Sequence, residues 1–426
     1  MNNSVRTAFA GTHILSKDIA FDTDTWETQV NNNVLIIGPS GAGKTRNYVM
    51  PNLRNCHESI IVSDTKGSLY KKFRDELESR GYEVVNIDFS DLGPSRGCSG
   101  NTIGYNPLDY IRFDPETGKY NEQDIMSLAA TLVPNFSRKD PYWDEAARQY
   151  LCVLIAYVLE TLPTYQHNLE YVHKVMLFMT ASCLENADKP NAENRMDMIM
   201  HELEINRPGS TTVSRYRALK AVATADRMFA SIHGILSTAL DPLCFDGALA
   251  LYKRKGRICF EDIGRRKIAV FLTVSDNDRS MDSLVKTFIT QAFQRLIRYA
   301  DKECAGNYLP VPVRVFLDDF ATNYTIPDFD NLISVIRSRE IYVSVILQSL
   351  TQLDALYDKP RAMTIINNCD SLLYLGGQDL ETAEYIAKRA NKPLEEIVTM
   401  PIDKAFLLRK GQKAVFTKKC PCPPSL

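Results

Sequence analysis

The residues best suited to chemistry lie at positions 38 to 45, where the sequence reads Gly-Pro-Ser-Gly-Ala-Gly-Lys-Thr. Their spacing fits G-x-x-x-x-G-K-[ST], and they directly follow Val34–Ile37, a short apolar run that predicts a buried strand. Glycines let backbone N–H groups curl around phosphate oxygens, and the amino end of a following helix strengthens the attraction. The sequence therefore predicts a loop that binds the phosphates of a nucleoside triphosphate, which we take to be ATP.

Each residue of this loop has an expected role. Lys44 would contact the β- and γ-phosphate oxygens, and the Thr45 hydroxyl would be a ligand of Mg²⁺. The alternative is an accidental glycine turn, which the agreement of all fixed positions with the strand context disfavours. We expect the nucleotide to be bound by Gly38, Pro39, Ser40, Gly41, Ala42, Gly43, Lys44 and Thr45.

A pair of acidic residues follows another apolar run, Val313–Leu317. Asp318 would hold Mg²⁺ together with Thr45, and Asp319 would orient or activate the attacking water. The alternative is a strand that ends in a solvated acidic turn. The presence of the phosphate loop favours the catalytic interpretation.

Gln348 and Arg337 complete the predicted catalytic group. Gln348 follows the predicted strand Tyr342–Leu347, and a polar residue at the carboxyl end of such a strand points into the nucleotide crevice. A simple hydrogen bond at the end of the strand is the alternative for Gln348. Arg337 would stabilise the charge of phosphoryl transfer in a neighbouring subunit, an effect worth about 10³–10⁵ in rate. Arg339 is a second candidate for this role, and a solvated arginine at a helix end is the alternative for both.

The elements that would position these residues alternate between strands and helices, which predicts an α/β fold with a mostly parallel sheet. Several apolar runs are continuous, as in strands that are covered on both faces. The predicted strands are Val34–Ile37, Ser59–Ser63, Glu83–Phe89, Lys267–Val274, Val313–Leu317, Tyr342–Leu347 and Ser371–Leu375. The predicted helices between them include Ser68–Arg80, Ser283–Tyr299, Asp328–Arg339 and Leu380–Ala390.

Between Asp109 and about Ala250 the strand pattern gives way to helical spacing, which predicts an inserted all-α domain. Its predicted helices are Gln123–Leu132, Tyr142–Leu162, Leu169–Leu177, Asn194–Ile205 and Arg215–Ala239. We therefore divide the chain into a lead-in at 1–30, a nucleotide-binding domain formed by 31–118 and 251–426, and an all-α domain at 119–250.

The composition is that of a globular protein, with 426 residues of which 45% are hydrophobic and 24% charged. A net charge of −2 excludes a global basic field, so any contact with nucleic acid must be local. The ten cysteines are scattered, and the close pair Cys420 and Cys422 lacks the additional ligands of a metal site. The longest apolar run, Leu151–Leu159, is too short to cross a bilayer, so we expect a soluble chain. Scattered thiols together with an ATP site favour a reducing cytoplasm as its location.

Two basic clusters, Lys253–Arg257 and Arg265–Lys267, would suit contact with a DNA backbone. Solvated basic loops are the alternative. Tyr142, Trp143 and Tyr216 in the helical region fit packing better than base stacking.

Seven short stretches accompany the glycine loop in an order that is found in one family of ATPases. They are Asn31–Asn33, Met50–Leu53, Asp64–Gly67, Gly104–Leu108, Phe316–Phe320, Leu347–Leu353 and Leu375–Gly377. On these stretches the chain resembles the type IV secretion coupling ATPases, which link conjugative DNA to the transfer channel. The resemblance covers about residues 31 to 410, and the combination is specific although any one stretch beyond the glycine loop is weak.

This resemblance implies a RecA-like motor domain and an inserted helical domain that contacts cargo. It implies ATP and Mg²⁺ as cofactors, a homo-hexameric ring when active, and single-stranded DNA, often with an attached relaxase, as the substrate. The partners would include components of the type IV secretion channel at the inner face of the bacterial cell membrane. The implied function is an ATP-driven pump, and the alternatives are a nucleotide-gated receptor with little hydrolysis or a related DNA-translocating or packaging ring.

The chain also departs from the family pattern. Thr65 and Ser68 stand where the family has proline and glutamate, and Asp319 stands where it has glutamate. Because aspartate is shorter, its reach to the attacking water is reduced, and slow hydrolysis would favour the receptor. Membrane-spanning helices usually precede the motor in this family, whereas about 30 residues precede it here, so we expect a cytosolic portion that is monomeric in isolation.

Overall fold

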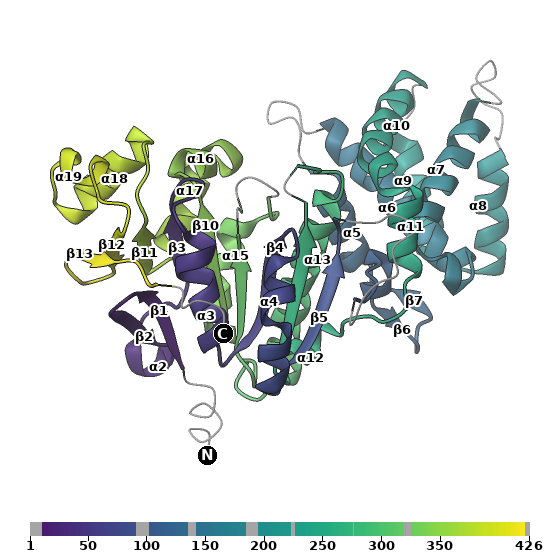
Figure 1. Ribbon diagram of the computed structural model, residues 1–426. Coiled ribbons are helices and arrows are strands. Elements are labelled where there is room, and N and C mark those ends of the chain that lie inside the picture. Colours follow the sequence, from purple (N-terminus) through teal and green to yellow (C-terminus); the bar gives the residue numbers. More distant parts are fainter. Residues whose placement is uncertain are drawn as a thin grey trace.

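The computed structural model describes residues 11–90, 102–134, 142–184, 195–222, 226–275, 277–318, 320 and 325–421. Figure 1 shows two parts side by side: a sheet flanked by helices, and a layer of helices drawn mostly in blue and teal. The beginning and the end of the chain build the sheet part, and the middle of the chain builds the helical layer. The predicted α/β fold with an all-helical insertion is confirmed.

A nine-stranded sheet organises the fold, in the order β13-β12-β11-β3-β10-β9-β4-β8-β5. The strands from β11 to β5 are parallel, and β12 and β13 are antiparallel additions at one edge. The carboxyl ends of the parallel strands therefore lie along a common edge of the sheet, where α/β proteins bind their ligands. The strands are β3 (Val34–Ile37), β4 (Ser59–Thr65), β5 (Glu83–Asp88), β8 (Ile268–Val274), β9 (Val313–Leu317), β10 (Ile341–Leu347), β11 (Ser371–Tyr374), β12 (Lys404–Arg409) and β13 (Val415–Lys418).

The sheet separates two cores, because successive side chains of a strand point to opposite faces. Val34 and Ile36 of β3 face the smaller core, and Leu35 and Ile37 face the larger one. An N-terminal hairpin and the helices after the phosphate loop and β4 close the smaller core. These elements are β1 (Thr12–Ser16), β2 (Ile19–Asp22), a π-helical turn η1 (Thr45–Val49), α3 (Met50–Asn55) and α4 (Ser68–Ser79).

The larger core runs from the other face of the sheet into the helical layer. The longest helix that covers it, α13 (Asp282–Glu303), buries an apolar stripe that includes Leu284, Phe288 and Leu296. The other elements of the sheet part are α2 (Thr25–Thr28), α12 (Phe260–Ile263), α15 (Phe329–Val335), η5 (Ile336–Arg339), α16 (Leu350–Tyr357), α17 (Lys359–Asn367), α18 (Leu380–Ala390) and α19 (Leu394–Val398).

The helical layer is centred on α6 (Tyr142–Thr161), which is buried along most of its length because α5, α9 and α10 pack around it. The other elements are η2 (Pro107–Tyr110), β6 (Phe113–Asp114), β7 (Lys119–Tyr120), α5 (Glu122–Leu132), η3 (Thr164–Gln166), α7 (Leu169–Leu184), α8 (Arg195–Asn206), α9 (Thr211–Val222), α10 (Asp226–Leu240), η4 (Asp241–Leu243) and α11 (Asp246–Lys253). The predicted helical segment Arg215–Ala239 is covered by two helices, α9 and α10, which both pack on α6, and residues 223–225 between them lie outside the described residues. The domain limits at residues 119 and 250 remain predictions.

Three hairpins within the described residues were not among the seven strands predicted from the sequence. They are β1–β2 near the amino end, β6–β7 before α5 of the helical layer and β12–β13 near the carboxyl end. Within the described residues, no single helix has the length and apolar character needed to cross a membrane. The segments Ser231–Leu243 and Asp246–Lys253 together have the length and apolar character of a membrane span, but they are bent by 69° where they meet.

Candidate functional site

The phosphate loop begins where β3 ends, in the middle of the sheet. The Gly38 N–H donates to the Leu347 carbonyl of β10 at 3.1 Å, which fixes the start of the loop to the neighbouring strand. Gly41 and Gly43 then adopt φ values of 78° and 90°, a left-handed conformation that favours glycine. A Cβ atom on Gly43 would lie 2.3 Å from Asn47 Oδ1. A residue with a side chain at position 43 would therefore force Asn47 to move, whereas glycine leaves it room.

Lys44 lies folded back over this loop. Its side chain is buried, and Nζ donates to the carbonyls of Gly38 at 2.9 Å and Pro39 at 3.2 Å. Carbonyl oxygens carry only a partial negative charge, whereas hydrogen bonds between an ammonium and a phosphate are charge-assisted and stronger. The arrangement can therefore hold the ammonium ready for a phosphate group.

Thr45 and Asp318 join the loop to the acidic strand end. The Thr45 hydroxyl donates to Asp318 Oδ2 at 2.8 Å, and the Asp318 side chain is almost fully buried at the carboxyl end of β9. A hydroxyl and a carboxylate oxygen are the hard ligands that Mg²⁺ prefers. These two residues fit the predicted magnesium site.

Gln348 lies at the same edge of the sheet. It follows β10, the strand that lies between β3 and β9 in the sheet, and its backbone N–H donates to Gln352 Oε1 at 3.3 Å. The carboxyl ends of three adjacent strands thus carry the phosphate loop, Gln348 and Asp318. Asp319 lies outside the described residues, so its predicted role stays a prediction.

Arg337 is placed elsewhere. It belongs to η5, which precedes β10, so it lies at the opposite edge of the sheet from the phosphate loop. There it lines a pocket of about 260 Å³ together with Trp26. Arg339, the second candidate, is bound to Asp301 of α13 by two hydrogen bonds at 3.0 and 3.1 Å. Within a single chain, therefore, neither arginine reaches the phosphate loop.

Comparison with known proteins identifies the family. A family model described as "Type IV secretory system Conjugative DNA transfer" matches residues 5–393 of the chain. The chain belongs to this family. Protein VirD4 of Agrobacterium fabrum is 24% identical over 363 residues, which are 83% of this chain and 48% of the relative. Conjugal transfer protein TraG of Escherichia coli is 22% identical over 372 residues, 84% of this chain and 54% of the relative. The chain spans about half the length of the curated relatives it matches.

Solved structures of the coupling protein TrwB share the fold. TrwB in complex with ADP and Mg²⁺ has a TM-score of 0.62 at 15% identity, with 92% of this chain and 86% of that chain covered. TrwB with the ATP analogue ADPNP has a TM-score of 0.64 at 15% identity, with coverages of 94% and 89%. VirB4 of Thermoanaerobacter pseudethanolicus is more distant, with a TM-score of 0.53 and 13% identity over 97% of both chains. The resemblance to the coupling family is confirmed.

A second motif of the chain, Asp64–Gly67, lies at the same edge of the sheet as the phosphate loop. The Asp64 carboxylate is fully buried near the carboxyl end of β4 and accepts hydrogen bonds from the backbone N–H groups of Leu69 and Tyr70 at 3.0 and 2.7 Å. Burial raises the pKa of the Asp64 carboxyl, and these hydrogen bonds oppose that rise. The motif therefore caps α4 and fixes the strand end next to Asp318.

Two contacts made near the carboxyl end were not predicted from the sequence: Lys419 contacts the phosphate loop, and Cys420 contacts the turn that follows it. Lys419 Nζ donates to the carbonyls of Ala42 and Leu375, both at 2.9 Å. The carbonyl of Cys420 accepts from Asn47 Nδ2 at 2.8 Å. No local pattern indicates these contacts, because they join residues more than 370 positions apart, except for the bond to Leu375 across 44 positions. Cys422, the partner of Cys420 in the close pair, lies outside the described residues.

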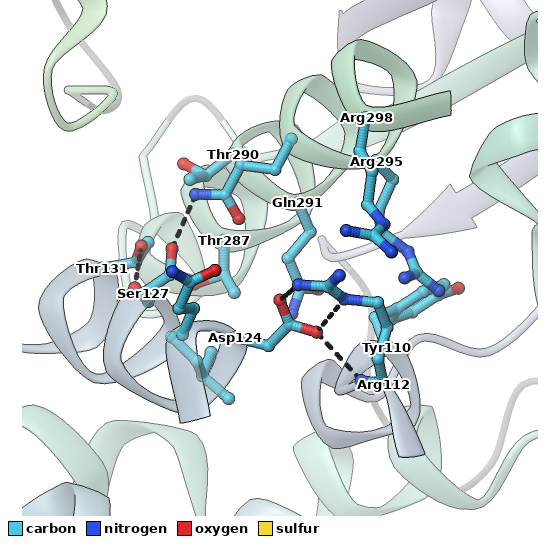
Figure 2. A pocket seen from close by; sticks show the side chains of 13 residues that line it. Tyr110, Arg112, Asp124, Ser127, Thr131, Thr287, Thr290, Gln291, Arg295 and Arg298 are labelled. Atoms are coloured by element: carbon cyan, nitrogen blue, oxygen red, sulfur yellow. Dashed lines mark hydrogen bonds and ion pairs between the residues drawn. The ribbon is translucent and has the colours of Figure 1, made fainter. Parts of the chain in front are cut away.

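A cavity of about 310 Å³, lined mostly by polar side chains, lies between α5 and α13, where the helical layer meets the sheet part (Figure 2). Arg112 donates from Nε and Nη2 to the Asp124 carboxylate of α5 at 2.7 and 2.6 Å. Gln294 of α13 donates to Ser127 Oγ of α5 at 2.6 Å. Because these groups already bind each other, we interpret the cavity as a polar joint between the two parts.

The predicted basic clusters are engaged within the chain. Arg257 is paired with Asp109, and Arg265 and Arg266 are both paired with Asp262. These partners favour the structural alternative over a DNA contact for these arginines. Tyr216 is buried and bonds to Asp197 at 3.2 Å, as expected for a packing residue.

Proposed function

We propose that this chain is an ATP-driven coupling motor that moves single-stranded DNA, with its relaxase, toward a type IV secretion channel at the inner face of the bacterial membrane. The observation that carries this proposal is the hydrogen bond of 2.8 Å between Thr45 and Asp318. It joins the phosphate loop to an acidic strand end, and this pairing recurs in P-loop ATPases. Membership of the conjugative DNA-transfer family supports DNA as the cargo and a type IV secretion channel as its destination.

In this proposal the residues at the sheet edge divide the work of ATP hydrolysis. The loop N–H groups and Lys44 would hold the β- and γ-phosphates, and Thr45 and Asp318 would hold Mg²⁺. When bound, Mg²⁺ supplies positive charge at the β- and γ-phosphates. Asp319 would accept a proton as the water oxygen bonds to the γ-phosphorus and ADP leaves, and Gln348 would contact the γ-phosphate.

We also propose that the active form is a homo-hexameric ring in which Arg337 of one chain completes the site of its neighbour. The position of Arg337, at the sheet edge opposite its own phosphate loop, supports an intersubunit role. The net charge of −2 gives single chains little attraction for anionic lipids, so DNA or a membrane partner would promote assembly.

The test uses purified protein and a Lys44→Ala variant. We expect ATP turnover that rises when single-stranded DNA is added, and turnover lost in Lys44→Ala with an unchanged melting temperature. The described hydrogen bonds of the Lys44 side chain run to the carbonyls of Gly38 and Pro39 in its own loop, so we expect its loss to spare the fold. Turnover equal in both proteins, with contaminating ATPases excluded, would refute the assignment.

A nucleotide-gated receptor is the second candidate, because Asp319 is shorter than the glutamate found in the family. Such a receptor would bind ATP and relaxase but hydrolyse ATP slowly, with or without DNA. Strong stimulation of turnover by DNA selects the motor, and tight ATP binding without stimulation selects the receptor.

A further inference from the structure

The Lys419 side chain, which directly follows β13, contacts the phosphate loop. The end of β13 is held on both sides: the Lys419 N–H donates to the Asp403 carbonyl at 2.9 Å, and the Lys17 N–H donates to the Lys418 carbonyl at 3.0 Å. Thr417 adds a hydrogen bond from its hydroxyl to Ser16 Oγ at 3.0 Å. These contacts fix the backbone of residues 417–419. The half-buried Lys419 side chain therefore starts from a fixed Cα position and extends to the loop.

The bonds of Lys419 act on one peptide unit of the loop. Its ammonium donates to the Ala42 carbonyl at 2.9 Å and to the Leu375 carbonyl, just after β11, at the same distance. In a planar trans peptide, the C=O of Ala42 and the N–H of Gly43 point in opposite directions. A carbonyl held toward Lys419 therefore turns the Gly43 N–H to the other side, away from Lys419.

A second contact holds the other side of Lys44. Asn47, in the first turn after the loop, donates from Nδ2 to the Cys420 carbonyl at 2.8 Å. The segment 419–420 thus bonds to the chain both before and after Lys44. Gly43 has a φ of 90°, and glycine has more conformational freedom than any other residue. A hydrogen bond from outside the loop therefore restricts the backbone more at this position than at other residues.

We propose that Lys419 is a positioning residue for the phosphate loop, holding the Ala42–Gly43 peptide with its N–H directed toward bound phosphate. The inference rests on the proposed ATP site and adds to it a control by the carboxyl-terminal hairpin. When a loop is ordered before binding, the free-energy cost of ordering it upon binding is smaller, and the affinity for the ligand is higher. Because Lys419 acts equally on ground state and transition state, its loss should raise KM and leave kcat nearly unchanged.

The chain offers a matched control in the neighbouring lysine. Lys418 is exposed, carries the same charge and precedes Lys419 directly. In Lys419→Met we expect the affinity for a fluorescent ATP analogue to fall, and the KM for ATP to rise, by about five- to tenfold. This is less than the full strength of a charge-assisted hydrogen bond, because Lys419 acts on the loop and not on the nucleotide itself. Lys418→Met should match the wild type, and Lys419→Arg, which keeps a donor, should recover most of the affinity. Equal ATP binding in Lys419→Met and Lys418→Met would overturn the proposal.

A measurement without nucleotide separates this inference from the ATP assignment. Amide hydrogen exchange of residues 40–45 should be faster in nucleotide-free Lys419→Met than in Lys418→Met, at equal melting temperature. If the wild type itself fails to bind ATP, the proposed function fails, and the exchange rates still decide whether Lys419 orders the loop. Identical exchange in the two variants would show that it does not.

Discussion

Lys44, Thr45 and Asp318 already bond to groups that a nucleotide would replace or share. Lys44 bonds to two loop carbonyls, and the Thr45 hydroxyl bonds to Asp318. Exchange of a carbonyl for a phosphate oxygen strengthens the bond to the ammonium. The site is therefore assembled before the ligand arrives, which lowers the ordering cost of binding.

Asp318→Asn should weaken the binding of Mg²⁺-ATP by about 10–100-fold, the range seen when a metal site loses a supporting ligand. The amide oxygen of asparagine can still accept the Thr45 hydrogen bond, so the fold should persist. Titrations with and without Mg²⁺ measure the difference. The exposed Asp328 provides the control as Asp328→Asn; equal Mg²⁺ dependence in both variants would remove Asp318 from the magnesium site.

Asp319→Asn should bind ATP without turning it over, because an amide cannot accept the proton of the attacking water. Asp319→Glu should raise turnover, since the longer side chain restores the reach that is usual in the family. Single-turnover measurements separate binding from hydrolysis. If Asp319→Asn hydrolyses ATP at the wild-type rate, another residue activates the water.

At the scale of elements, β9 carries the proposed magnesium ligand at its carboxyl end and a buried ion pair near its amino end. Asp318 follows its carboxyl end, and near its amino end the fully buried Arg314 donates to Glu58 at 2.8 Å and to the Asn32 carbonyl at 3.0 Å. Glu58 precedes β4 and Asn32 precedes β3, so one guanidinium joins the starts of three strands. The alignment of the phosphate loop with Asp318 depends on this register.

Glu58→Gln should destabilise the fold by about 3–5 kcal/mol at neutral pH, because it leaves a buried charge without its partner. Burial alone would raise the pKa of the Glu58 carboxyl, but Arg314 holds that pKa below its ordinary value. The folded-state pKa is therefore lowered, and the stabilisation is complete at neutral pH and is lost as the pH falls through the lowered value. Melting temperatures across acidic pH, with Glu76→Gln at an exposed ion pair as the control, measure this. Equal losses in both variants would contradict the role of the buried pair.

The elements also explain what the sequence could predict. Gly38–Thr45, Asp318 and Gln348 each follow an apolar run, so local patterns place all of them at strand ends. Lys419 gives no such signal, because its bond to Ala42 spans 377 positions and depends on β13. That strand is a short edge strand with Val415 and Phe416 partly exposed, so it lacks the continuous apolar run of the central strands. Contacts that arise only after the sheet is assembled leave no mark on the local sequence.

At the scale of the molecule, the sheet part and the helical layer are joined by polar contacts around α13. Tyr105 donates its hydroxyl proton to Gln291 Oε1 at 2.8 Å, and Gln291 donates to the Pro107 carbonyl at 3.0 Å. The Arg112–Asp124 ion pair continues this joint along the cavity in Figure 2. These polar contacts lie beside the larger apolar core, which runs continuously from the sheet part into the helical layer.

The position of Arg337 allows a test of whether ATP turnover requires a ring of several chains. It is separated from its own phosphate loop by the seven residues of β10, about 20 Å at 3.3 Å per residue, so rotation of one side chain cannot bring the two together. Arg337→Ala and Lys44→Ala chains should each be nearly inactive alone. When they are mixed in equal amounts, about a quarter of the interfaces in a head-to-tail ring should pair an intact Lys44 with an intact Arg337.

Turnover in the mixture should therefore recover to at most about a quarter of the wild-type rate. The control replaces the Lys44→Ala chain with a Lys44→Ala, Arg337→Ala double variant, which builds no intact interface and should give no recovery. DNA is added to both mixtures, because it would collect subunits whose own contacts are weak. Recovery in the first mixture alone places Arg337 in its neighbour's site, since no single chain in that mixture carries both residues. If co-assembly is demonstrated by a label on each variant and turnover still fails to recover, the arginine that completes the site must be sought elsewhere on the chain.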